Sequence, residues 1–169
     1  DDLRALRKLW PHRLMVKGLL HPQDAAMAAD CGADGVIVSN HGGRNLDTAI
    51  SPIEALPEVV DAVGKRVAVL VDSGFRRGTD VAKALAMGAQ AVMVGRSTLY
   101  GVAAGGEAGA RRAIELFRGE IDRVIALLGC TSVAELSTEH LHAPDLPVRA
   151  AEPVRPGLKL LDTARAAER

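Results

Sequence analysis

A histidine, two glycines and an arginine follow within six residues of an apolar segment, residues 36–38. Imidazole exchanges protons near neutral pH, so His41 is a candidate general base. Gly42 and Gly43 allow the backbone to turn sharply and a ligand to approach it closely. The planar guanidinium of Arg44 can bind a carboxylate or phosphate through two hydrogen bonds. This stretch therefore fits chemistry on an acid, although a strand, a glycine turn and a surface arginine would explain it as well.

The composition narrows the function classes. The 169 residues are enough for one domain with a core, and 21 basic residues balance 21 acidic ones. A net charge of zero and only 2% aromatic residues argue against nucleic acid as a partner. Cys31 and Cys130 match no metal-ligand spacing, so we expect no metal and two reduced thiols of a cytosolic protein.

The chain ends carry two further expectations. The first residues do not form a signal peptide, and no apolar run approaches the ~20 residues of a membrane span. The chain lacks an initiator methionine and opens within an amphipathic helix, so we expect it to begin inside a longer protein. We expect a cytoplasmic location and leave peripheral membrane association open.

Strands and helices are expected to alternate four times. The predicted strands, which are continuous apolar runs, are residues 14–16, 35–39, 67–71 and 91–94. The predicted helices are residues 2–9, 24–31, 52–63, 79–87, a short one near 98–100, 110–128 and 131–136, with a glycine-rich turn at 101–109. Four prolines after His142 predict an arm, residues 142–169, beyond a first unit at 1–141.

Continuous apolar strands separated by helices predict a parallel sheet, either doubly wound or part of a (β/α)8 barrel. Polar residues decide between them: Lys17, Ser39 with His41, Asp72 and Arg96 each follow the predicted end of a different strand. Such ends converge at the mouth of a barrel, where active sites form. Glycine-rich turns after the last two strands match the phosphate site between strands 7 and 8, so we expect strands 5 to 8 of an α/β TIM barrel.

Four motifs resemble the FMN-dependent α-hydroxy acid oxidases and dehydrogenases. They are LMVKG at residues 14–18, SNHGGRNLD at 39–47, DSGFRRGTD at 72–80 and GR at 95–96. The resemblance covers roughly residues 3–141 and is strongest to the mandelate dehydrogenase and hydroxymandelate oxidase branch. It implies a (β/α)8 barrel, bound FMN and oxidation of a mandelate- or lactate-like 2-hydroxy acid to the 2-oxo acid.

The resemblance also implies residue roles. Lys17 corresponds to the lysine that stabilises negative charge on reduced flavin. His41 corresponds to the catalytic base, which removes either the α-proton or the hydroxyl proton of the substrate. Arg44 corresponds to the arginine that binds the substrate carboxylate.

The remaining implied contacts are with the cofactor. Ser39 corresponds to a flavin-contacting serine, and Asp72 to an aspartate near the ribityl chain. The two glycine-rich turns supply the other expected contacts with the cofactor: Ser73, Gly74, Phe75, Arg76, Gly95 and Arg96.

What the chain lacks leads to further expectations. In the family, the first barrel half supplies substrate-contacting tyrosines and the aspartate that pairs with the histidine. We therefore expect the N-terminal half as a partner, poor or no activity of this chain alone, and a homo-oligomer, a tetramer by resemblance. The alternatives are a nucleotide-binding barrel of the inosine monophosphate dehydrogenase type and a non-catalytic half-barrel. The first would need a catalytic cysteine loop, and no cysteine lies between Val36 and Val94.

Overall fold

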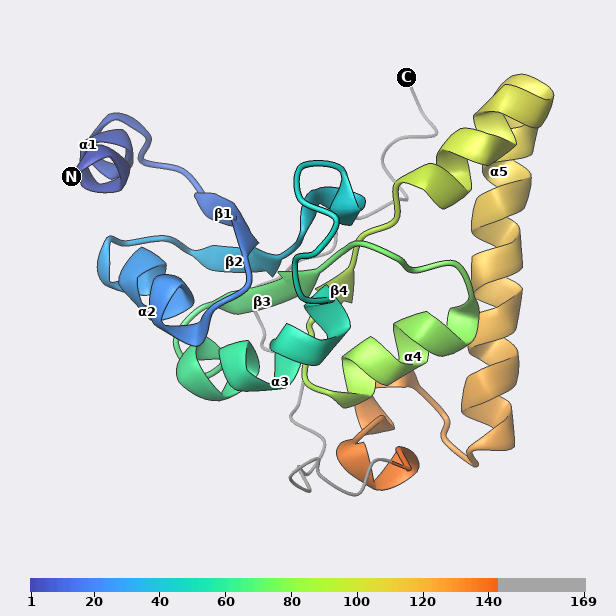
Figure 1. The fold of residues 1–169 in the computed structure, drawn as a ribbon. Coiled ribbons are helices and arrows are strands. Elements are labelled where there is room, and N and C mark those ends of the chain that lie inside the picture. The colour runs from blue at the N-terminus through green and yellow to red at the C-terminus, as the bar shows by residue number, and fades with distance from the viewer. Residues whose placement is uncertain (143–169) are drawn as a thin grey trace.

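A computed structural model describes residues 1–142 of the chain. Four strands alternate with helices along this length (Figure 1). The strands are β1 (Met15–Leu19), β2 (Gly35–Val38), β3 (Ala68–Val71) and β4 (Ala91–Val92). The helices are α1 (Asp2–Leu9), α2 (Pro22–Asp30), α3 (Pro52–Val63), α4 (Gly78–Ala86) and α5 (Arg96–Leu127), with 3-10 turns η1 (His41–Gly43), η2 (Val133–Glu135) and η3 (Thr138–His140).

The four strands form one parallel sheet in the order β1-β2-β3-β4. A doubly wound sheet reverses its strand order at a switch point, whereas a barrel places successive strands side by side. The sequential order is therefore that of a barrel segment, as the strand-end residues predicted.

Helices cover one face of this sheet. Val36 and Val38 on β2 and Val69 and Val71 on β3 are fully buried. Their partners in the core come from α2, α3 and α4 and include Ala25, Leu56, Val59, Val63 and Ala84. Because side chains alternate across a strand, Lys17, Ile37 and Leu70, which share a register, project from the opposite face. That face corresponds to the inside of the barrel.

Local contacts close the first turns of α2 and α3. Pro22 opens α2, and the ring of His21 accepts a hydrogen bond from the backbone of Gln23 at 3.2 Å. Glu54 accepts one from the backbone of Ser51 at 3.2 Å, which closes the first turn of α3.

The prediction for the first strand is wrong at its end. We expected the strand to stop before Lys17, but β1 continues to Leu19 and Lys17 lies within it. The register shifts between Lys17 and Leu19 because Gly18, at φ +101°, forms a bulge that the other residue types disfavour.

The expected glycine-rich turn at 101–109 is also largely wrong. Residues 96–127 form helix α5, interrupted only at Gly105 and Gly106, where the backbone is non-helical. The two parts of α5 fold back on each other (Figure 1). A Cβ on Gly101 would lie 2.4 Å from the carbonyl oxygen of Gly109, so these glycines permit close helix packing rather than a loop.

The end of the chain is only partly described. The expected helix at 131–136 is reduced to the 3-10 turn η2. The predicted arm falls almost entirely outside the described residues. Within the described part, no helix combines the length and the apolar character needed to cross a bilayer.

Candidate active site

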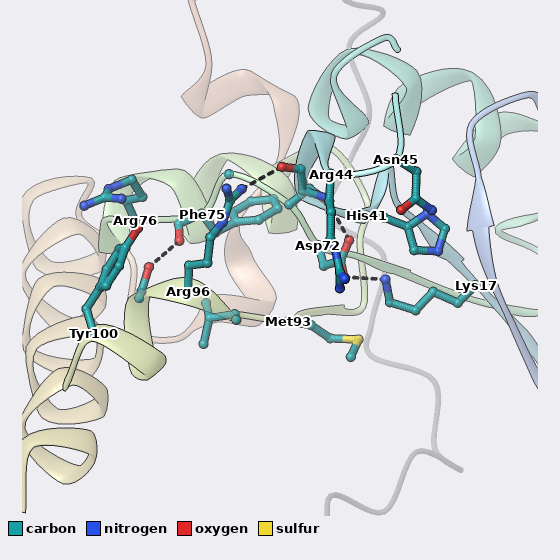
Figure 2. Close-up of a pocket in the computed structure, with 16 residues that line it drawn as sticks. Lys17, His41, Arg44, Asn45, Asp72, Phe75, Arg76, Met93, Arg96 and Tyr100 are labelled. Carbon is teal, nitrogen blue, oxygen red and sulfur yellow. Dashed lines mark hydrogen bonds and ion pairs between the residues drawn. The ribbon is translucent and has the colours of Figure 1, made fainter. Parts of the chain in front are cut away.

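A cavity of about 590 Å³ opens where the carboxyl ends of the strands meet. Lys17 and His41 lie at one end of it, and Arg76 with Tyr100 lies at the other (Figure 2). The predicted site residues that line it are Lys17, His41, Arg44, Asp72, Ser73, Gly74, Phe75, Arg76, Gly95 and Arg96. The structure thus brings together Lys17 from within β1 and residues of the loops that follow β2, β3 and β4.

His41 is held by its own loop and by β1. Its backbone lies in the left-handed region at φ +56°, and its N–H donates to Ser39 Oγ at 3.1 Å. Asn40 closes the following turn, because its Oδ1 accepts from the backbone of Gly43 at 3.1 Å. A Cβ on Gly18 would lie 2.7 Å from His41 Cε1, so the imidazole packs directly on the bulge.

Lys17 and Asp72 form an ion pair inside the cavity. Lys17 Nζ lies 2.7 Å from Asp72 Oδ2 and donates to Ser39 Oγ at 2.8 Å. Burial by itself would raise the pKa of Asp72, but hydrogen bonds from Lys17, Ser39 and Ser73, with the charge of Lys17, hold that pKa below its ordinary value of 3.8. The carboxylate therefore stays ionised and fixes the ammonium group.

Ser39 does not line the cavity, unlike the other predicted residues. It is only 1% exposed, and its hydroxyl lies beneath the cavity between Lys17 and the His41 loop. Ser39 thus holds Lys17 and the backbone of His41 in place through its hydroxyl group. Its expected contact with the flavin stays a prediction.

The loop after β3 is shaped by carboxylates behind it. Asp80 Oδ2 accepts from the backbone N–H groups of Arg76 at 3.0 Å and Arg77 at 2.9 Å. Glu120 on α5 accepts from the backbone of Gly78 at 2.6 Å and pairs with Arg77. These contacts hold the loop from outside and leave its inner edge open to the cavity.

The N-terminus of α5 faces the same space. Its first N–H groups have no partner within the helix, and they carry the positive end of the helix dipole. Ser97 Oγ donates to the carbonyl of Phe75 at 2.9 Å, which ties this terminus to the loop after β3. A Cβ on Gly74 or Gly95 would meet nothing within 4 Å, so both backbones border open space.

Cationic groups surround this space. Arg96 Nη2 donates to the carbonyl of Gly42 at 2.8 Å, and the guanidinium of Arg76 lies 5.7 Å from the ring centroid of Tyr100. Arg44 lines the cavity at the end of η1. Lys17 and these three arginines give the cavity lining an excess of positive charge over the single carboxylate, that of Asp72. The cavity therefore suits an anionic ligand at one end and proton transfer by His41 at the other.

Several contributing residues were not predicted from the sequence. Tyr100 and Met93 line the cavity, while Gly18 and Asn40 position the His41 loop. The LMVKG motif contains Gly18 and could have pointed to it. The pairing of Tyr100 with Arg76 depends on the three-dimensional path of α5 and leaves no signal in the sequence.

Comparison with known proteins identifies related sequences. The family described as FMN-dependent dehydrogenase matches residues 1–143. An (S)-mandelate dehydrogenase of Pseudomonas putida is 56% identical over 141 residues, which are 83% of this chain and 35% of that protein. An L-lactate oxidase of Nostoc sp. is 50% identical over 142 residues, 84% of this chain and 39% of that protein.

A solved structure agrees with the fold. A crystal structure of the monotopic membrane protein (S)-mandelate dehydrogenase matches with a TM-score of 0.81 at 55% identity, over 83% of this chain and 37% of that one. This likeness confirms the predicted barrel segment. The chain spans well under half the length of each of these relatives.

Proposed function

Because this chain belongs to the FMN-dependent dehydrogenase family, we propose that the protein containing it oxidises a 2-hydroxy acid to the 2-oxo acid. The names of the relatives, which include a mandelate dehydrogenase and a lactate oxidase, support a mandelate- or lactate-like substrate. The single observation that carries the proposal is the shared cavity of Lys17, His41 and Arg44. A base, an ammonium and a carboxylate-binding guanidinium are the groups that this reaction requires.

FMN is the cofactor of this family, and the residues of the cavity fit it. Open space over Gly74 and Gly95 allows a phosphate to approach backbone N–H groups and the N-terminus of α5. The guanidinium groups of Arg76 and Arg96 would complete this phosphate site. When bound, FMN supplies an acceptor for the two electrons that leave the substrate.

Arg44 and His41 would act on the substrate. The guanidinium of Arg44 binds the carboxylate and orients the neighbouring carbinol carbon. A ring nitrogen of His41 accepts a proton from the substrate, either from the α-carbon or from the hydroxyl. Among residues 1–142 no carboxylate is hydrogen-bonded to the imidazole, so a counter-charge for the protonated ring would come from another part of the protein.

Lys17 would stabilise the negative charge that develops on the cofactor during reduction. A fixed ammonium does this best when it does not have to reorient, and its bonds to Asp72 and Ser39 hold it in place. Asp72 itself would lie near the ribityl chain, and Ser73 and Phe75 would contact the cofactor through the loop after β3.

The rest of the protein belongs to the same proposal. We propose that an N-terminal barrel half completes the site and that this chain alone is inactive, since it spans 35–39% of the first two relatives. Assembly as a homo-oligomer and a cytoplasmic location remain predictions. The name of the monotopic relative supports testing for peripheral membrane association. The inosine monophosphate dehydrogenase alternative gains no support from these relatives.

The test replaces His41 by glutamine in the complete protein loaded with FMN. Anaerobic mixing with (S)-mandelate or L-lactate should reduce the flavin about 10²- to 10⁴-fold more slowly than in the wild type, the usual contribution of a general base. His12→Gln, which changes an exposed imidazole far from the cavity, serves as the control and should keep the wild-type rate. Equal rates for wild type and His41→Gln would remove His41 from its role.

A further inference from the structure

Ser73 has a backbone conformation that serine rarely adopts. Its φ is +76°, and the only other described non-glycine residue in this region is His41. A side chain in the left-handed region is disfavoured because Cβ crowds the following carbonyl. The neighbouring Gly74, at φ +86°, shows that this loop requires such angles. A serine here therefore needs a compensating role for its side chain.

The hydroxyl of Ser73 connects two parts of the site. Ser73 Oγ donates to Asp72 Oδ1 at 2.8 Å and accepts from the backbone N–H of Gly42 at 3.0 Å. A hydroxyl has one hydrogen to donate and lone pairs to accept with, so both bonds form together. One atom thus links the Lys17–Asp72 ion pair to the loop that carries His41.

Gly42 is held from both sides. Its N–H belongs to the peptide unit that follows His41 and is bound by Ser73, while its carbonyl accepts from Arg96 Nη2 at 2.8 Å. The N–H of His41 is bound by Ser39. The side chains of Ser39, Ser73 and Arg96 therefore fix the backbone on both sides of His41. Of these, Ser73 binds the N–H of the peptide that follows His41.

We propose that Ser73 is a positioning residue for His41, which acts through the N–H of Gly42. This inference rests on the proposed function only for its catalytic consequence. Without the hydroxyl, the peptide after His41 loses its partner in the loop after β3, and the left-handed φ of His41 is no longer enforced from that side. The imidazole then spends less time in reach of the substrate.

The test compares Ser73→Ala and Ser73→Gly in the complete, FMN-loaded protein. Both variants lack the hydroxyl, but glycine accepts φ +76° without strain, so it also serves if the alanine variant fails to fold. Hydrogen–deuterium exchange should show the Gly42 amide exchanging about fivefold faster or more in both. Anaerobic flavin reduction at saturating substrate should slow about tenfold, with little change in KM because Arg44 is retained.

Ser132→Ala is the control, because it removes an exposed serine hydroxyl at the start of η2, a residue that does not line the cavity. It should leave exchange at Gly42 unchanged. Unchanged exchange at Gly42 in both Ser73 variants would overturn the inference whatever the identity of the base. Faster exchange in Ser73→Ala but not in Ser73→Gly would assign the change to backbone strain rather than to the lost hydroxyl. Faster exchange at Gly42 with an unchanged rate of flavin reduction would refute the catalytic consequence. Loss of FMN with normal exchange would make Ser73 a cofactor contact only.

Discussion

The substitution Gly18→Ala changes the position of His41 without changing its chemistry. An alanine Cβ would lie 2.7 Å from His41 Cε1, whereas carbon atoms in contact stay about 3.5–4.0 Å apart. The ring must therefore retreat by about 1 Å, a displacement that can reduce a catalytic rate about 10²-fold. Alanine at φ +101° also costs about 1–3 kcal/mol of folding free energy. We expect both effects in the complete protein.

Gly88→Ala separates the two effects. Gly88 has φ +102°, and its added Cβ would lie 2.8 Å from Val60 Cγ1, away from the cavity. Urea denaturation should show a similar loss of unfolding free energy for Gly18→Ala and Gly88→Ala. Anaerobic stopped-flow reduction of the flavin should slow about 10²-fold in Gly18→Ala alone. If both variants reduce their flavin at the same rate, the contact between Gly18 and His41 does not position the base.

Two further outcomes are expected. Asp72→Asn should lower the unfolding free energy by about 2 kcal/mol at pH 6, because the charged hydrogen bond to Lys17 is lost. The pKa of Asp72 is lowered from 3.8, so the difference in unfolding free energy between wild type and Asp72→Asn should shrink as the pH falls below 3.8. Denaturation at pH 6 and at pH 3 would measure this difference. Asp122→Asn, at an exposed position on α5, is the control and should show neither effect. Tyr100→Leu should weaken FMN binding roughly two- to fivefold, the value of an exposed cation–π contact with Arg76, and Tyr100→Phe should restore it in fluorescence titrations. Equal weakening by both Tyr100 variants would assign the effect to the hydroxyl instead.

The strands could be predicted from the sequence where apolar residues run without interruption. The continuous apolar runs around Val36 and Val69 predicted parallel strands, because such strands are typically covered on both faces. In the structure β2 is buried throughout, whereas burial alternates along β3. The end of β1 was missed because Gly18 lets the chain bulge and the strand continue, and the imidazole that packs against Gly18 comes from a distant part of the sequence. The glycines at 101 and 109 signal a turn locally, but helix packing elsewhere in the chain makes them helical.

The site was predicted at the level of residue types rather than contacts. Polar residues at strand ends were expected to meet, and Lys17, His41, Asp72 and Arg96 line one cavity. The hydrogen bonds that order them depend on backbone angles that no pattern of side chains encodes. Serine at φ +76° is the clearest case, because residue 73 would not be assigned to the left-handed region from its type.

The break in α5 at Gly105 and Gly106 offers a place to attach a reporter. A Cβ added at either position would meet nothing within 4 Å, and the residues around the break are exposed. The close contact between Gly101 and Gly109 holds the two parts of α5 together between the break and Arg96. An inserted peptide or a coupled dye at the break would therefore not displace Arg96. A fluorophore at this tip could follow assembly of the complete barrel while the catalytic groups keep their places.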